Sequence, residues 1–324
     1  MIFLGCDGGS TKTEWLLAED SGRVLSHRTF TGCNYAFLGQ EGFAQLMAEN
    51  VRELLREAGG ITAGDITAAM LGLTIYGELP DTEKTMPAAV EAALPGCGEI
   101  ILANDSLPGW AGSLAVRPGV NIVAGTGSVA YGRDLERQGK RVGGWSLFFA
   151  DEGSCSWVAR QLIEAFVKQA DGRCPRSPLY EAVRADLSIT NDLYFSGYLQ
   201  DDLVKDSALL AKLQLTALRA AQRGDAIALD IYRRAAAELA DTAEAVRQQL
   251  RFPEGAPVRA SYSGGLFRAG EVILSPFREE MECRGFTLAE PAYSPIVGAL
   301  ALAAEKYLSQ GALDRLMEAA SGQL

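Results

Sequence analysis

The first thirty residues consist of short apolar, extended runs separated by turn-forming residues. The extended runs cover 2–5, 13–18 and 23–30. Between them lie Asp7-Gly8-Gly9-Ser10-Thr11-Lys12 and Glu19-Asp20-Ser21-Gly22, rich in the residues that tight turns favour. The pattern predicts three antiparallel strands joined by hairpins.

Farther along, apolar residues no longer alternate with polar ones but recur every three or four residues. Residues 40–58 carry apolar side chains at helical spacing. Helices and strands then alternate, which is typical of parallel strands joined by right-handed crossovers. The predicted elements are a strand at 68–73, a helix at 81–94, a strand at 99–103 and a helix at 106–114.

After Arg117-Pro118-Gly119 the strand-and-turn pattern starts again, which predicts a second domain with the same plan. Domain boundaries are predicted at 1–116 and 117–324, with a helical insertion at about 177–251 and a helix at about 295–308 that can pack back on the first domain. The remaining predictions are strands at 120–124, 129–133 and 258–262, helices at 152–170 and 268–282, an almost wholly helical stretch at about 200–251, and an irregular glycine-rich segment at 139–145.

Composition narrows the function. The length of 324 residues suits two domains of roughly 150 residues each. A net charge of −11 disfavours a nucleic acid polymer or an anionic membrane as partner. Six cysteines without a C-x-x-C pair, and no apolar run near the ~20 residues of a membrane span, favour a cytoplasmic protein. Since His27 is the single histidine, catalysis is expected to use carboxylates, hydroxyls and backbone amides.

Glycine is unusually frequent: 35 of the 324 residues are glycine, about 11%, whereas the usual share is about 7%. This indicates many turns or close backbone approaches. Three turns combine glycine with hydroxyl side chains after a strand: Asp7 to Thr13, Gly125-Thr126-Gly127-Ser128 and Ser263-Gly264-Gly265. Such turns present several donors to one point and suit phosphate oxygens, although each alone is also typical of an ordinary hairpin. Two similar hairpins opening two domains favour the phosphate interpretation.

Known nucleotide motifs fit poorly. The G-x-x-x-x-G-K-[ST] pattern is absent. Gly125-Thr126-Gly127-Ser128-Val129-Ala130 matches the dinucleotide fingerprint in letters, but no helix is predicted to open there.

Several polar residues follow predicted strands, and each has two interpretations. Asp105 is either a general base at a strand end or a helix N-cap, and Asp7 either holds Mg²⁺ through water or stabilises a turn. Asp151, in Asp151-Glu152-Gly153-Ser154, either caps a helix or binds sugar hydroxyls beside Trp145. Asn34 either binds a ligand or forms a turn.

Taken together, the chain resembles the BadF/BadG/BcrA/BcrD ATPase family, and within it the N-acetylglucosamine kinases. The resemblance spans essentially the whole chain. It implies an α/β fold of two ribonuclease-H-like domains of the actin and hexokinase type, with an interdomain cleft for Mg-ATP. It rests on Gly5 to Thr13, Asn104-Asp105, Gly125 to Ser128, Gly143-Gly144-Trp145, Asp151 to Ser154 and Ser263-Gly264-Gly265.

The resemblance also implies roles for individual residues. Asp105 would be the catalytic base for transfer of the γ-phosphate of ATP to the 6-hydroxyl of an amino sugar, N-acetylglucosamine first, with glucosamine and N-acetylmuramic acid as alternatives. Asp7 would lie near Mg²⁺. The implied cofactor-binding residues are Asp7, Gly9, Ser10, Thr11, Lys12, Gly125, Thr126, Gly127, Gly264 and Gly265, and the implied substrate-binding residues are Asn34, Asp105, Ser128, Gly144, Trp145 and Asp151. A homodimer is left open.

Two alternatives stay open. The family also contains ATPase activators of radical dehydratases, which ligate an iron–sulfur cluster through paired cysteines that this chain does not present. A sugar-binding regulatory protein without turnover is the other alternative.

Two departures from the family pattern concern the choice of substrate. Phe148 and Phe149 follow the glycine pair, and we expect them to pack in the core rather than to reshape an acyl pocket. Ala269 offers no hydroxyl to the nucleotide.

Overall fold

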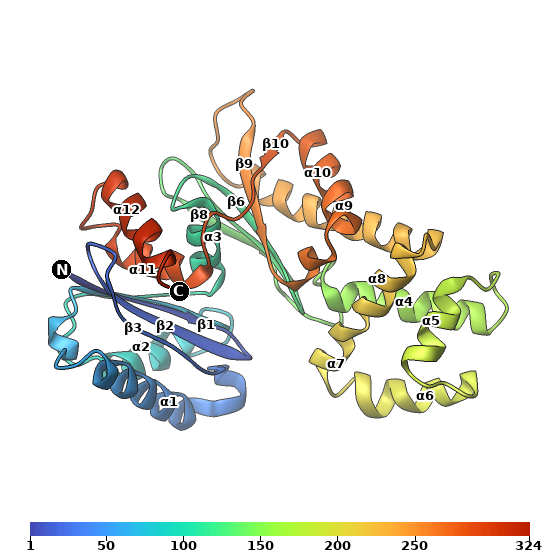
Figure 1. Ribbon diagram of the computed structural model, residues 1–324, viewed down its shortest axis with the longest axis horizontal. Coiled ribbons are helices and arrows are strands. Elements are labelled where there is room, and N and C mark those ends of the chain that lie inside the picture. The colour runs from blue at the N-terminus through green and yellow to red at the C-terminus, as the bar shows by residue number, and fades with distance from the viewer. The chain divides into compact units, whose positions relative to one another are not determined.

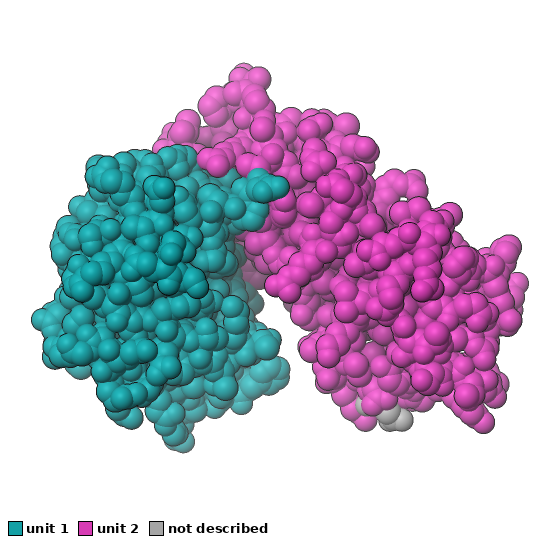
Figure 2. All heavy atoms as spheres, viewed as in Figure 1, with its two compact units in different colours: residues 1–117, 290–324 teal, residues 118–289 magenta. Residues whose placement is uncertain are grey.

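The computed structural model describes the backbone of residues 1–324 and every side chain except that of residue 201. The chain forms two compact units (Figure 2). Unit 1 contains residues 1–117 and 290–324, and unit 2 contains residues 118–289. The sequence predicts that 117–324 forms the second domain, and that within it only the helix at 295–308 packs back on the first domain. In the structure all of 290–324 belongs to unit 1.

Unit 1 is built on a five-stranded mixed sheet in the order β3-β2-β1-β4-β5 (Figure 1). The first three strands are antiparallel, as their tight turns predict, and β4 and β5 run parallel to β1. Their bounds are β1 Ile2–Gly8, β2 Lys12–Glu19, β3 Val24–Thr31, β4 Ala68–Leu73 and β5 Ile100–Ala103.

Helices cover both faces of this sheet. On one face lie α1 and α2, whose buried apolar side chains form a core with the strands. On the other face lies α11, which packs against β1, β2, β4 and α3, with α12 beside it. The bounds are α1 Tyr35–Glu57, α2 Thr82–Ala93, α3 Ser106–Leu114, α11 Pro295–Ala304 and α12 Gln310–Ser321, with a 3₁₀ turn η1 at Ala63–Asp65. The predicted last helix therefore ends earlier, at Ala304, and α12 was not predicted.

Glycines let α11 lie unusually close to its neighbours. A Cβ built on Gly5 of β1 would lie 2.6 Å from the backbone nitrogen of Leu300, closer than real Cβ atoms are found. A Cβ on Gly298 would similarly collide with the backbone of Gly112 in α3. Part of the glycine excess therefore serves backbone packing between α11, β1 and α3, and not ligand-binding turns.

Unit 2 contains a second five-stranded sheet, in the order β10-β9-β6-β7-β8. β6, β7 and β8 are antiparallel neighbours, while β9 and β10 run parallel to β6. The bounds are β6 Gly119–Ala124, β7 Ser128–Arg133, β8 Gly139–Gly143, β9 Val258–Ser263 and β10 Phe286–Leu288. The prediction of an irregular segment at 139–145 is wrong for 139–143, which form β8. This edge strand is exposed or half-buried along its length and has no alternation of apolar and polar residues.

In unit 2, α9 packs on β6, β7 and β8, and α4, α8 and α10 pack against α9. The helix predicted from 152 begins at Cys155, because Ser154 is the N-cap whose side chain accepts from the amide of Trp157 at 3.1 Å. The bounds are α4 Cys155–Ala170, α5 Pro178–Asp186, η2 Asp192–Tyr194, α6 Phe195–Tyr198, η3 Leu199–Leu203, α7 Ser207–Lys212, α8 Gln214–Gln222, α9 Ala226–Gln248, η4 Gly265–Ala269 and α10 Glu271–Cys283. No helix among the described residues is long and apolar enough to span a bilayer.

Candidate functional site

In unit 1 the predicted site residues gather where β1, β4 and β5 end. Asp7 of β1 is the register partner of Gly72 in β4, and Gly72 is the partner of Ala103 in β5. Asp105 follows Ala103 by two residues. Because parallel strands end at the same edge of a sheet, this topology brings Asp7 and Asp105 to one place.

The carboxyl groups of Asp7 and Asp105 interact electrostatically. Burial raises the pKa of Asp7 to about 7, and the charges of Asp105 and Glu14 add to this, while Lys12 opposes it. Crowded carboxylates of this kind suit a hard cation. The described residues hold no group of three or more acidic, histidine or cysteine side chains for a metal. Mg²⁺ commonly takes only one or two carboxylates and completes its shell with water and phosphate, so Asp7 fits that ion.

Asp105 occupies the N-cap position of α3, but its side chain makes no capping hydrogen bond. The adjacent Asn104 fills that role, because its Oδ1 accepts from the amide of Ser106 at 3.2 Å. Asn104 Nδ2 also donates to Oε1 of Glu78 at 2.7 Å. The capping interpretation of Asp105 is therefore wrong.

The turn between β1 and β2 is a tight hairpin with exposed hydroxyls at its tip. The amide of Gly9 donates to the carbonyl of Lys12 at 3.0 Å, and Ser10 and Thr11 are exposed. Lys12 itself donates to Glu14 Oε2 at 2.9 Å. A Cβ on Gly32 would lie 2.8 Å from the amide nitrogen of Thr11, so the segment after β3 presses directly on the turn.

Asn34 combines two structural contacts. It is the N-cap of α1, with Oδ1 accepting from the amide of Ala36 at 2.9 Å, and its Nδ2 donates to Ser10 Oγ at 3.0 Å. The hydroxyl oxygen of Thr74, just after β4, also lies 3.4 Å from Ser10 Oγ. Thr74 and Glu78 were not predicted as candidate site residues. The rule that ligands meet the carboxyl ends of parallel strands applies to β4 as well, and could have found both.

The predicted residues of unit 2 also come together. In the turn between β6 and β7, the amide of Gly125 donates to the carbonyl of Gly127 at 2.9 Å. The Gly125 carbonyl accepts from the amide of Cys155 at 2.9 Å, which joins the turn to the start of α4. Gly264 has a φ of 105°, and a Cβ there would lie 2.6 Å from the carbonyl carbon of Ala124. Only glycine suits that position, and Thr126 and Gly265 are left exposed beside it.

Asp151 is buried against the same turn. Its carboxylate lies so near Gly127 that a Cβ on this glycine would be 3.3 Å from Asp151 Cγ and would collide with Oδ2. Asp151 Oδ1 accepts from the amide of Ser146 at 3.3 Å. Burial raises the pKa of Asp151, while the amides of Ser146 and Trp145 oppose the rise.

The loop before Asp151 exposes aromatic side chains. Trp145 is 85% exposed, Phe149 is 91% exposed and Phe148 is 41% exposed. The expectation that both phenylalanines pack in the core is wrong. Arg160 of α4 holds the loop by donating to the carbonyl oxygens of Phe148 and, at 2.8 Å, Ala150, so that the backbone faces the helix.

Two further predicted residues make contacts that shape this loop. Ser128 Oγ is buried and donates to the carbonyl of Glu152 at 2.7 Å, and the carbonyl of Gly144 accepts from Arg141 at 2.9 Å. Ala269, the last residue of η4, is 7% exposed. Its side chain therefore packs inward.

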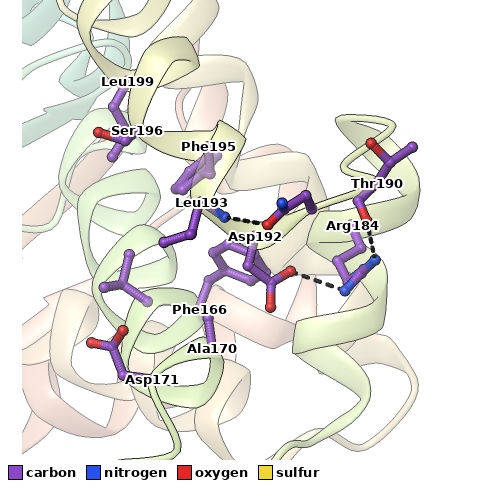
Figure 3. Close-up of a pocket in the computed structure, with 12 residues that line it drawn as sticks. Phe166, Ala170, Asp171, Arg184, Thr190, Asp192, Leu193, Phe195, Ser196 and Leu199 are labelled. Carbon is purple, nitrogen blue, oxygen red and sulfur yellow. Dashed lines mark hydrogen bonds and ion pairs between the residues drawn. The ribbon is translucent and has the colours of Figure 1, made fainter.

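A separate pocket of about 700 Å³ lies among α4, α5 and α6 (Figure 3). Its lining includes Phe166, Leu193 and Phe195, but none of the residues predicted from the sequence to bind ligands. Arg184 donates to Asp192 Oδ1 at 2.9 Å within the pocket wall, so these two charges neutralise each other.

Comparisons with known proteins agree with this arrangement. The model of the BadF/BadG/BcrA/BcrD ATPase family matches residues 4–303. The chain is 26% identical to an N-acetyl-D-glucosamine kinase of Dictyostelium discoideum over 277 residues, covering 82% of this chain and 85% of the relative. It is also 26% identical to an N-acetylmuramic acid/N-acetylglucosamine kinase of Clostridium acetobutylicum over 282 residues, covering 85% and 89%.

Solved structures show the same fold. A candidate N-acetylglucosamine kinase from Chromobacterium violaceum superimposes with a TM-score of 0.72 at 24% identity, covering 93% of this chain and 98% of the other. A ROK family glucokinase from Streptomyces griseus, in complex with glucose and AMPPNP, superimposes with a TM-score of 0.55 at 19% identity, covering 94% and 100%. The chain therefore shares with these proteins an α/β fold of two units, each with a five-stranded mixed sheet.

Proposed function

The chain belongs to the BadF/BadG/BcrA/BcrD ATPase family, and from that premise we propose that it transfers the γ-phosphate of ATP to the 6-hydroxyl of an amino sugar. N-acetylglucosamine is the first candidate substrate, with glucosamine and N-acetylmuramic acid as alternatives. The names of the related kinases support this substrate class.

The observation that carries the proposal is the environment of Asp105. Its carboxylate follows the end of a parallel strand and interacts electrostatically with that of Asp7. In the proposed reaction this carboxylate accepts the proton of the sugar 6-hydroxyl as the hydroxyl oxygen bonds to the γ-phosphorus. The bond from that phosphorus to the bridging oxygen of ADP breaks, and ADP leaves with the electron pair.

The two hairpin turns supply donors for the phosphates. We assign Ser10, Thr11 and Lys12 of unit 1 and Thr126 of unit 2 to the phosphates of ATP. The amides of Gly9 and Gly125 already donate within their turns, so Gly9, Gly125 and Gly127 would act by shaping those turns. Asp7 would hold Mg²⁺, directly or through water, and the ion when bound would neutralise charge on the transferred group. Positioning and charge neutralisation account for most of the catalysis of phosphoryl transfer, so no histidine is required.

The remaining residues would bind the other parts of the substrates. Gly264 and Gly265 lie exposed beside the Gly125 turn, which supports a role against adenosine. We assign the sugar to Asn34, Ser128, Gly144, Trp145 and Asp151. Since the hydroxyl of Ser128 and the carbonyl of Gly144 already have partners, we expect these two to act chiefly by shaping the loop.

A sugar panel tests the proposal. The protein is incubated with Mg-ATP and N-acetylglucosamine, glucosamine, N-acetylmuramic acid or glucose, and ADP release and product position are measured. We expect 6-phosphorylation of at least one amino sugar. Asp105→Asn should lower kcat by about 10³-fold or more while ATP still binds. Asp81→Asn, at an exposed N-cap without a capping bond, is the matched control and should keep full activity.

The same panel separates the two alternatives. Tight sugar binding without phosphoryl transfer at high Mg-ATP would favour the regulatory protein. Anaerobic incubation with iron and sulfide, followed by a visible spectrum, tests the activator. A stable cluster together with an inactive sugar panel would replace the kinase proposal.

A further inference from the structure

Gly72 stands between the strand of Asp7 and the strand that leads to Asp105. It is paired in register with Asp7 on one side and with Ala103 on the other. Gly72 is buried and lies in β4, the strand that ends between the two proposed functional carboxylates. It is therefore placed where its size can affect both neighbours.

The space beside Gly72 is filled by the first turn of α3. A Cβ built on Gly72 would lie 2.7 Å from Cδ of Pro108, would collide still more severely with Cγ of that ring, and would lie 3.4 Å from Cα of Asp105. Real Cβ atoms are essentially never found closer than 3.0 Å to another heavy atom. The proline ring is rigid, and its φ is fixed, so it cannot rotate away as a flexible side chain would.

The helix that would have to move is also in close contact with α11. A Cβ on Gly298 of α11 would collide with the carbonyl oxygen of Pro108 and the amide nitrogen of Gly112, so α3 and α11 are already in close backbone contact. Because its backbone already touches that of α11, α3 has little room to shift as a whole. A methyl group at position 72 would therefore displace the first turn, which carries Asp105.

We propose that Gly72 is a positioning residue that sets the distance of Asp105 from Asp7 by allowing the first turn of α3 to touch β4. This inference rests on the proposed function, because it assigns Gly72 a role in the geometry of that reaction. The electrostatic interaction between Asp7 and Asp105 is consistent with the close approach.

Three variants test the inference: Gly72→Ala, Pro108→Ala and the double variant. Pro108→Ala removes Cγ and Cδ, the two atoms that the new methyl group would meet. We expect Gly72→Ala to lower kcat by roughly 10- to 100-fold, as a misplacement near 1 Å can, with KM values for ATP and sugar changed less than about threefold. Pro108→Ala alone should stay within about threefold of wild type, and the double variant should recover most of the lost kcat.

Gly132→Ala is the matched control. Gly132 is a buried strand glycine of unit 2, and a Cβ there would lie 2.7 Å from Val246 Cγ1, away from the proposed site residues. It should lose stability and keep its kcat, which separates misplacement of Asp105 from general destabilisation.

The outcomes are decisive in each direction. A Gly72→Ala variant as active as wild type, equal losses of kcat in Gly72→Ala and Gly132→Ala, or a double variant that is as slow as Gly72→Ala would overturn the inference. If Gly72→Ala is insoluble, a soluble and active double variant supports the inference and an insoluble one overturns it. An inactive wild-type protein would instead contradict the proposed function.

Discussion

Gly127 leaves the space that the carboxylate of Asp151 occupies. A Cβ on Gly127 would collide with Asp151 Oδ2, and Asp151 in turn accepts from the amide of Ser146. One glycine without a side chain thus joins the proposed phosphate-binding turn to the proposed sugar-binding loop.

Replacing Gly127 by alanine should therefore weaken sugar binding. The new methyl group would push the Asp151 carboxylate away, and we expect the KM for sugar to rise roughly tenfold, about 1.4 kcal/mol. Steady-state kinetics and calorimetric titration with sugar measure the effect. Gly197→Ala, where a Cβ would meet nothing within 4 Å, is the control and should behave as wild type. An unchanged KM and unchanged sugar affinity would show that the Asp151 carboxylate does not bind the sugar.

Asp7→Asn should stabilise the protein at high pH. Burial raises the pKa of Asp7 to about 7, above its value of 3.8 in an exposed chain, so the folded state holds this proton more tightly than the unfolded state. Its stabilising contribution is complete below pH 4 and is lost as pH rises through 7. Asparagine does not titrate, so we expect the variant to gain roughly 2–4 kcal/mol over wild type at pH 8.

Denaturant unfolding at pH 5, 6, 7 and 8, without Mg²⁺ or ATP, measures this difference. Asp65 provides a comparison of opposite sign, because hydrogen bonds from Thr62 lower its pKa. Asp65→Asn should be less stable than wild type by a constant amount across pH 5–8, because the charged carboxylate that Thr62 stabilises is already fully formed above about pH 4. If the difference between Asp7→Asn and wild type does not depend on pH, Asp7 titrates in its ordinary range.

Two substitutions of Asn34 separate its structural contact from a role with ligand. Asn34→Asp keeps the capping oxygen for the amide of Ala36 but loses the donor to Ser10, whereas Asn34→Ala loses both. We expect Asn34→Ala to cost about 1 kcal/mol of stability and Asn34→Asp to cost little. If the amide also binds sugar, both variants raise the KM for sugar. A raised KM in Asn34→Ala alone would point to the cap instead.

Phe149 should influence selectivity more than stability. Because its side chain is 91% exposed, Phe149→Ala should change the free energy of unfolding by less than about 0.5 kcal/mol. If the ring contacts an acyl group, the preference for N-acetylglucosamine over glucosamine, as a ratio of kcat/KM values, should fall roughly tenfold. Leu135→Ala, also exposed but in the hairpin between β7 and β8, should leave the ratio unchanged. An unchanged ratio in both variants would place Phe149 outside the substrate site.

Most of the fold was predictable because its elements carry strong local signals. The hairpins of unit 1 have glycine turns between alternating strands, and the parallel strands are continuous apolar runs. β8 and β10 lack such signals, because β8 is an exposed edge and β10 has only three residues. α12 was not predicted although it carries a helical signal, since Leu313, Leu316, Met317 and Ala320 repeat at helical spacing and are buried.

The site was predictable only in part, for a similar reason. Asp7 and Asp105 could be found because each directly follows or ends an apolar strand. Gly72 could not, because its role depends on contact with Pro108, a residue of another element that no local pattern connects to it. The exposure of Phe148 and Phe149 likewise depends on Arg160, which holds their loop from α4.

Unit 1 is discontinuous in the chain, and this affects the order in which a newly made protein can fold. The ribosome releases residues 1–117 first, then all 172 residues of unit 2 (118–289), and α11 only afterwards. Until α11 emerges, the face of the first sheet around Phe3 and Gly5 has no helix to cover it. We expect unit 2 to complete its core during synthesis while unit 1 waits, exposed to aggregation and available to chaperones, for its last segment.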